Sequence, residues 1–274
     1  MPPTLKTAAL ATGVRLPYAE QGDPGGTPVL MLHGATDSWR SFEPILPFLP
    51  GSLRALALTQ RGHGDAERPE SGYEIADLTA DAVAFLDALE IDRAVVVGHS
   101  MGTWVAESIA ASQPDRVAGL VLAGAPGPAA ANPAIDGFMA EVAALEDPVP
   151  REFAHEFQVS TLERPIGASR LDGFVDESMK LPARVWRALF AGFGRCDLSR
   201  DWARIDAPTL LVWGDRDGFV TRAEQDALEV GIRGATLRVY EGTGHAVHWE
   251  EPQRFAADVA ALAARASAAR AEAA

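Results

Sequence analysis

Six short apolar runs, each followed by glycine or a small polar residue, constrain the fold of this chain more than any other feature. They span residues 29–32, 53–58, 94–97, 117–122, 209–213 and 236–240. Near-continuous apolar runs of this length are typical of strands buried on both faces. Helix-like segments lie between or after them, at 75–89, 103–112, 222–230 and from 252 onward. This alternation predicts an α/β fold with a mostly parallel, doubly wound sheet, and residues 5–20 are expected to add an antiparallel edge hairpin.

The alternation stops between residues 126 and 201. Helix-like stretches with no clear strand fill this part of the chain, at 135–145, 151–158, 173–179 and 184–190. We therefore predict a core domain made of residues 1–125 and 202–274, with a helical cap (lid) inserted at 126–201 over the strand ends. The Ala- and Arg-rich tail from Ala260 is expected to fray.

Composition narrows the possible partners. The 274 residues are 47% hydrophobic and 23% charged, which is ordinary for a globular protein, and the formal net charge is −14. Such a negative surface repels phosphate backbones and anionic headgroups, so neither nucleic acid nor membrane is an expected partner. A single cysteine, Cys196, excludes an intrachain disulfide, and residues 1–20 lack the pattern of a signal peptide. A cytoplasmic location in a bacterium with a GC-rich genome is expected, and the sequence leaves a homodimer open.

The segment Gly98-His99-Ser100-Met101-Gly102 carries the strongest chemical signal. It follows an apolar strand and precedes a helix, which is the context in which G-x-S-x-G presents a nucleophilic serine. The glycines let the backbone turn sharply, and the helix N-terminus faces the charge that develops on a reacting oxygen. Ser100 is the predicted nucleophile. His99 points away from its hydroxyl and is expected to pack beneath this turn.

The chain resembles the α/β-hydrolase fold superfamily, in the group of small bacterial esterases, lactonases, perhydrolases and meta-cleavage-product hydrolases. The segments that carry the resemblance are His33-Gly34-Ala35, Arg61-Gly62-His63-Gly64, Gly98 to Gly102, Gly214-Asp215-Arg216-Asp217 and Gly244-His245. They imply an α/β-hydrolase fold over nearly the whole chain. They imply little about the substrate.

The resemblance also assigns partners to Ser100. The order in this fold is serine, acid, histidine. The family places its acid three residues after a strand-ending glycine, which implies Asp217, with Asp215 expected to bracket the turn. His245, in the Gly-His signature, is the implied base, and the rival His248 is expected to be a buried structural histidine beside Trp249.

Two backbone amides should stabilise the oxyanion. One belongs to Met101, directly after the nucleophile, and the resemblance of His33-Gly34-Ala35 to the family's His-Gly-X implies Ala35 as the other. No metal and no organic cofactor are expected. The candidates for the pocket wall are His33, Trp104, Phe138 and Trp186, whereas Cys196 is expected to be a buried filler.

These residues predict hydrolysis of a carboxylic ester or lactone of a small, largely apolar molecule through an acyl-enzyme. A C–C bond hydrolase of the meta-cleavage type is an alternative, for which Arg61, Arg184 or Arg187 would have to bind a substrate carboxylate. Perhydrolysis at the same site is a second alternative, and a non-catalytic ligand receptor is a third. Epoxide hydrolase and haloalkane dehalogenase are disfavoured, because those relatives place aspartate where this chain has Ser100.

Overall fold

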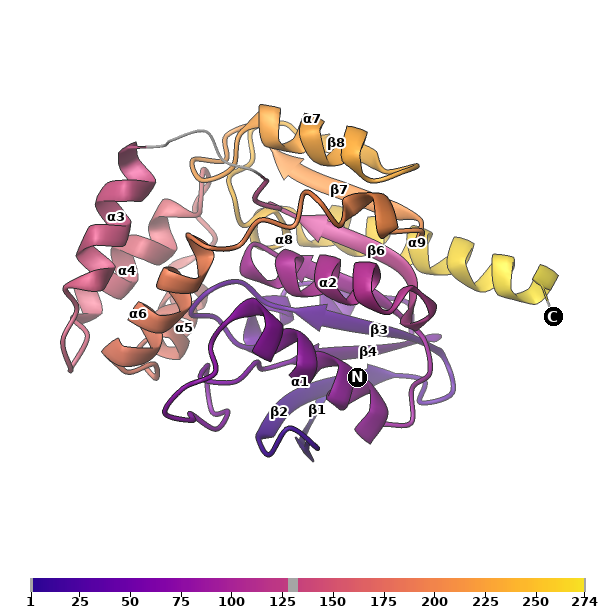
Figure 1. Cartoon of the computed structure of the whole chain (residues 1–274), viewed down its shortest axis with the longest axis horizontal. Helices are drawn as coiled ribbons and strands as arrows, with labels where there is room; N and C mark the ends of the chain where they lie inside the picture. Colours follow the sequence, from indigo (N-terminus) through magenta and orange to yellow (C-terminus); the bar gives the residue numbers. More distant parts are fainter. Residues whose placement is uncertain (1, 128–132, 274) are drawn as a thin grey trace.

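A single sheet of eight strands organises the computed structural model, which describes residues 2–127 and 133–273. Its strand order is β1-β2-β4-β3-β5-β6-β7-β8 (Figure 1). The bounds are β1 Thr4–Ala9, β2 Arg15–Gly22, β3 Thr27–Leu32, β4 Leu53–Leu58, β5 Ala94–His99, β6 Val117–Ala123, β7 Thr209–Gly214 and β8 Thr236–Tyr240.

The strands from β4 to β8 along the sheet pair in parallel, whereas β1 and β2 form the antiparallel edge that the sequence predicted. Parallel neighbours need crossover connections, and these place helices on both faces of the sheet. The α/β-hydrolase fold class expected from the sequence is confirmed.

Alternating side chains of each central strand enter two separate cores. On β3, Leu30 and Leu32 pack into the core shared with helices α1 and α2, while Met31 packs into the core shared with α9. This period of two explains why the runs read as continuously apolar. The sheet is therefore held rigidly between two apolar layers, which fixes the positions of its strand ends.

Four helices of the two layers follow the predicted segments closely, at α1 Ile75–Ala88, α2 Met101–Ser112, α7 Arg222–Gly231 and α9 Pro252–Ala273. A short helix that was not predicted, α8 Val247–Glu250, precedes α9. The expectation of a frayed tail from Ala260 was wrong. Helix α9 continues to Ala273, and Leu262 and Ala263 are buried against the sheet. Among the described helices, none combines the length and the apolarity that crossing a membrane requires.

Four helices occupy the chain between β6 and β7. They are α3 Pro133–Ala143, α4 Arg151–Ser160, α5 Ala168–Ser178 and α6 Ala183–Phe193. They gather at one end of the molecule, beyond the carboxyl ends of the parallel strands (Figure 1). Loops at that end of an open α/β sheet are where ligands bind. The division into a core domain and a cap stays a proposal.

Candidate active site

Ser100 lies on the sharp turn between β5 and α2. Its backbone has φ 50° and ψ −120°, a conformation that residues other than glycine seldom adopt. The turn is held by two backbone hydrogen bonds, from Ser100 N to Ala123 O (2.9 Å) and from Thr103 N to Ser100 O (2.8 Å). Serine is therefore kept in a strained position that the fold over-determines.

The two glycines of the motif are required by close approach of the backbone. A Cβ at Gly98 would lie 2.4 Å from the carbonyl oxygen of Gly102, and a Cβ at Gly102 would lie 2.1 Å from that of Leu32. Both distances are far below van der Waals contact. No other residue fits at either position without moving the turn.

Asp217 and His245 meet at the carboxyl ends of β7 and β8. His245 Nδ1 lies 2.7 Å from Asp217 Oδ2, and both side chains are buried. The other carboxylate oxygen of Asp217 accepts from the backbone N–H groups of Phe219 (2.8 Å) and Val220 (3.0 Å). These bonds fix the carboxylate, which in turn fixes the orientation of the imidazole. His245 and Ser100 line one cavity.

The rival residues have other partners. Asp215 accepts a hydrogen bond from Gly242 N at 2.6 Å, so its carboxylate bridges the two strand-end loops. His248 is fully buried and its Nε2 lies 2.9 Å from Ser41 Oγ. Of the two carboxylates and two histidines weighed in the sequence, the structure brings together Asp217 and His245.

Buried histidine rings surround His245. His99 lies beneath the turn, with ring centroids 5.0 Å from His245 and 4.3 Å from His248, and its Nε2 donates to the backbone oxygen of His245. Burial lowers the pKa of His99, and it lowers the pKa of His248 to about 3. Both neighbours therefore stay neutral at physiological pH, and neither opposes a positive charge on His245.

Met101 and Ala35, whose backbone amides are the predicted oxyanion donors, line the same cavity as Ser100. Met101 is the first residue of α2, where N–H groups lack partners within the helix. In the part of the chain that the structure describes, neither amide donates to another protein group. Both remain available to an oxygen atom bound beside Ser100.

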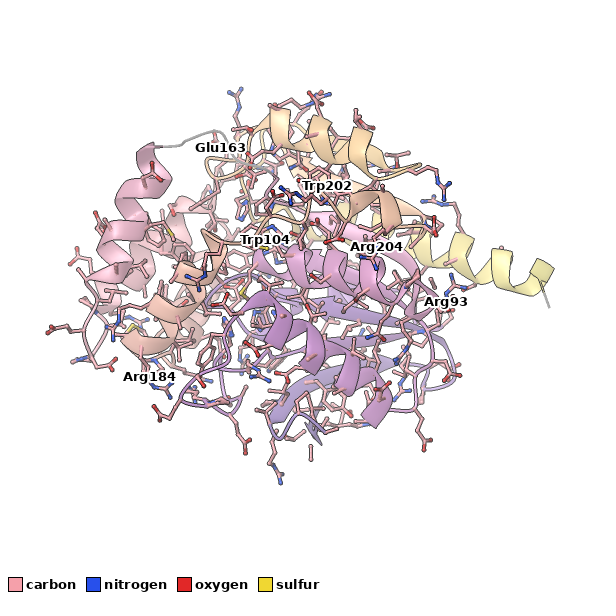
Figure 2. The ribbon with its side chains drawn as sticks, viewed as in Figure 1. Arg93, Trp104, Glu163, Arg184, Trp202 and Arg204 are labelled. Atoms are coloured by element: carbon pink, nitrogen blue, oxygen red, sulfur yellow. The ribbon has the colours of Figure 1, made fainter. Side chains whose placement is uncertain are left out.

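The cavity has a volume of about 700 Å³ and lies between the sheet and the α3–α6 segment. Two of the four residues predicted for its wall, Trp104 and Phe138, line it. Figure 2 labels Trp104, which comes from α2 and packs on Phe193 of α6 with ring centroids 5.2 Å apart. Apolar atoms make up most of the surface of the cavity wall, so the site favours an apolar ligand.

The other two predicted wall residues, His33 and Trp186, do not line the cavity, and this corrects the prediction. Trp186 is fully buried among aromatic rings inside the α3–α6 segment, and Phe190, one helical turn further on, faces the cavity instead. His33 uses both ring nitrogens beneath the loop. Its Nδ1 donates to Gly34 O (2.8 Å) and its Nε2 accepts from Gln60 N (3.0 Å).

Asp37 lines the cavity and was missed in the sequence. It stands two residues after Ala35 and is buried, and burial raises the pKa of its carboxyl to about 7. The sequence did contain a signal for Asp37: it is an aspartate in the same strand-end loop as Ala35, the expected oxyanion donor. Cys196 also lines the cavity, and burial raises the pKa of its thiol to about 12, which suits an inert side chain.

Comparison with known proteins identifies the family to which the chain belongs. Residues 29–258 match the model of the alpha/beta hydrolase family. The chain is 30% identical to a non-heme chloroperoxidase of Streptomyces lividans, over 93% of this chain and 98% of the relative. It is 28% identical to 2-hydroxy-6-oxononadienedioate/2-hydroxy-6-oxononatrienedioate hydrolase 2 of Pseudomonas putida, over 88% of this chain and 89% of the relative.

Solved structures agree with this placement. An esterase from a Rhodococcus species matches with a TM-score of 0.82 and 27% identity, covering 95% of this chain and 98% of that one. A hydrolase from Pseudomonas aeruginosa matches with a TM-score of 0.84 and 27% identity, covering 94% and 98%. Fold and relatives together define a hydrolytic enzyme. The chain belongs to the alpha/beta hydrolase family, as its motifs indicated.

Proposed function

We propose that this hydrolase cleaves a carboxylic ester or lactone of a small, largely apolar substrate, using Ser100 as nucleophile. The observation that carries the proposal is the buried 2.7 Å contact between Asp217 and His245, in a cavity that also contains Ser100 on its strained turn. A carboxylate, an imidazole and a serine in this chain order are the residues that acyl transfer requires.

The proposed reaction has two halves. His245 Nε2 takes the proton of Ser100 as the hydroxyl oxygen attacks the carbonyl carbon, and the amides of Ala35 and Met101 stabilise the oxyanion. His245 then gives that proton to the departing alkoxide oxygen, which leaves an acyl-enzyme. Water, activated by His245, attacks the acyl carbon, and the acid leaves as Ser100 regains its proton. Asp217 holds the imidazole tautomer throughout.

The site weighs against the C–C hydrolase alternative, whose substrates carry a carboxylate. None of the described residues that line the cavity is lysine or arginine. Arg61 forms a bidentate ion pair with Asp81, and Arg184 donates to backbone carbonyls of the 68–69 loop. Arg187 donates to the carbonyl of Leu145. All three arginines named from the sequence are therefore engaged elsewhere.

Perhydrolysis is the second candidate, and the Streptomyces lividans relative favours it through its chloroperoxidase name. In that reaction hydrogen peroxide replaces water as the nucleophile that attacks the acyl carbon. A peracid leaves and Ser100 regains its proton. The same residues serve both reactions. The two reactions differ only in whether water or hydrogen peroxide attacks the acyl-enzyme.

A fluorophosphonate probe tests the proposal and separates it from the receptor alternative. We expect wild type to be labelled and Ser100→Ala to remain unlabelled, because the probe phosphonylates the hydroxyl of an activated serine. Hydrolysis of p-nitrophenyl esters of short acids should be lost in the same variant. Labelling that persists in Ser100→Ala, or wild type that neither labels nor hydrolyses, would refute a serine hydrolase at this site.

A further inference from the structure

Asp37 has no part in the proposed acyl transfer, yet it occupies the cavity beside the reacting groups. It is 4% exposed and lines the same cavity as Ser100 and His245. It lies two residues from the proposed oxyanion donor Ala35, so their Cα atoms are at most about 7 Å apart. A group of the substrate within a few bonds of the scissile carbonyl therefore comes within reach of Asp37.

The carboxyl group of Asp37 is held from two sides. Its Oδ1 accepts a hydrogen bond from Gln158 Nε2 of α4 at 3.0 Å, and its Oδ2 accepts one from Ser41 Oγ at 3.1 Å. Gln158 Nε2 is itself 2.8 Å from Ser178 Oγ, and Ser41 Oγ is 2.9 Å from His248 Nε2. The carboxyl group is therefore fixed in place rather than free to rotate.

This carboxyl has acceptor capacity that the protein does not use. An ionised carboxylate has about four acceptor positions, and the described contacts fill two of them. In the part of the chain that the structure describes, no lysine or arginine forms an ion pair with Asp37. A buried carboxyl without a cation is costly, and a polar group on a bound ligand would offset that cost for an aspartate in the wall of a cavity.

The charge of the cavity selects the kind of group. The other ionisable carboxyls that line it are Asp136 and Asp197, both exposed, and Glu224, which accepts from Gly127 N and Thr221. The described carboxylates would repel an anionic substrate there. A hydroxyl group suits Asp37 best, because it donates to an ionised carboxylate and accepts from a protonated one.

We propose that Asp37 is a specificity-determining residue that binds a hydroxyl group on an uncharged, otherwise apolar ester or lactone. This inference rests on the proposed function and narrows its substrate class. The substrate hydroxyl donates to the free acceptor positions of the Asp37 carboxylate while its carbonyl oxygen lies against the Ala35 and Met101 amides. Substrates that carry a methyl group in place of that hydroxyl leave the carboxyl buried without its partner.

Isosteric pairs of esters test this directly. On the acyl side the pair is ethyl 3-hydroxybutanoate and ethyl 3-methylbutanoate, and on the alcohol side it is 2-hydroxyethyl butanoate and propyl butanoate. The acid released is titrated at constant pH, and kcat/KM is compared within each pair. We expect wild type to prefer the hydroxylated member of one pair by about 10- to 100-fold, the usual range for a hydrogen bond to a charged group. The pair that shows the preference identifies the side of the substrate that Asp37 binds.

The variants Asp37→Asn and Asp37→Ser should reduce that preference to about threefold or less, because neither retains a carboxylate. Asp136→Asn, which removes an exposed carboxylate of the same cavity, is the matched control and should keep it. If Asp37 served only to hold Gln158, its variants would change kcat/KM equally for both members of a pair, and the proposal would be wrong. The wild-type comparison needs no variant, so a misfolded one leaves the test standing.

Failure of this inference differs from failure of the proposed function. Wild type that labels with fluorophosphonate and hydrolyses both members of both pairs at similar rates refutes the role of Asp37 alone. Preference that survives intact in both Asp37 variants does the same. Wild type that neither labels nor hydrolyses any of the four esters refutes the proposed function instead.

Discussion

Replacement of Asp217 by asparagine is the sharpest mechanistic test that the site offers. The side chains are nearly the same size, and Oδ1 of asparagine can still accept from the amides of Phe219 and Val220, which lie 2.8 and 3.0 Å from Asp217 Oδ1. The amide nitrogen would then face His245 Nδ1 in place of the carboxylate oxygen now 2.7 Å away. The variant should fold normally with its charge removed.

The expected loss follows from that geometry. An NH₂ group facing Nδ1 donates to it, so the imidazole proton moves to Nε2, the nitrogen that must accept the proton of Ser100. The positive charge on His245 also loses its buried partner. Loss of tautomer control in this arrangement lowers kcat by about 10,000-fold. At 1.36 kcal/mol for each factor of ten, this corresponds to about 5 kcal/mol of transition-state stabilisation.

The measurement is kcat for a p-nitrophenyl ester, with the melting temperature recorded to verify folding. Asp215→Asn is the matched control, because asparagine can still accept the hydrogen bond from Gly242 N, and its kcat should stay within about twofold of wild type. An Asp217→Asn enzyme within tenfold of wild type would contradict the reasoning. So would an inactive Asp215→Asn enzyme.

Three further outcomes are expected. Gly34→Ala should lower kcat by about 100-fold or more, because its Cβ would lie 2.9 Å from His99 Nδ1 and displace the loop that carries one expected oxyanion donor. Gly173→Ala on α5, where a Cβ would have no neighbour within 4 Å, should keep kcat, and equal effects of the two variants would contradict this. Burial raises the pKa of Glu107 to about 8, from 4.5 in the unfolded chain. Between these two pH values the folded protein keeps a proton that the unfolded chain has lost, so the free energy of unfolding falls as pH rises. The melting temperature gained by Glu107→Gln should therefore be larger at pH 9 than at pH 5, and an equal gain would show that the carboxyl ionises freely. Iodoacetamide at pH 7.5 should leave activity intact, because the thiol of Cys196 is almost wholly protonated there, and rapid inactivation together with a carbamidomethyl group on this residue would show otherwise.

Short-range patterns in the sequence predicted the sheet and most of the residues of the candidate site. Apolar runs marked the strands because the central strands of this sheet are covered on both faces, and Gly98 and Gly102 marked the turn because backbone atoms approach where a Cβ would stand. Asp217 was implied by the family's placement of its acid three residues after Gly214, and His245 by the Gly-His signature. Each of these signals lies in a few consecutive residues, which is why the sequence alone could reveal them.

The wall of the cavity depended on contacts that no local pattern records. Trp186 and Phe190 share one face of α6, yet of the two only Phe190 lines the cavity, and Trp186 is fully buried against Phe153 and Phe157 of α4. The carboxyl group of Asp37 is held by hydrogen bonds from Gln158 and Ser41, which lie 121 and 4 residues away along the chain. Whether an aromatic or a carboxyl group faces a ligand is decided by such distant neighbours.

The left-handed backbone of Ser100 has a consequence for how this chain evolves. At φ 50° a serine is strained by about 1–3 kcal/mol relative to glycine, which adopts that conformation freely. Mutation of Ser100 to glycine would therefore relieve strain while removing the proposed nucleophile. A lineage that used the fold only to bind a ligand would gain by accepting glycine there. With Ser100 as the proposed nucleophile, only selection for turnover would maintain serine at this position against the thermodynamic advantage of glycine.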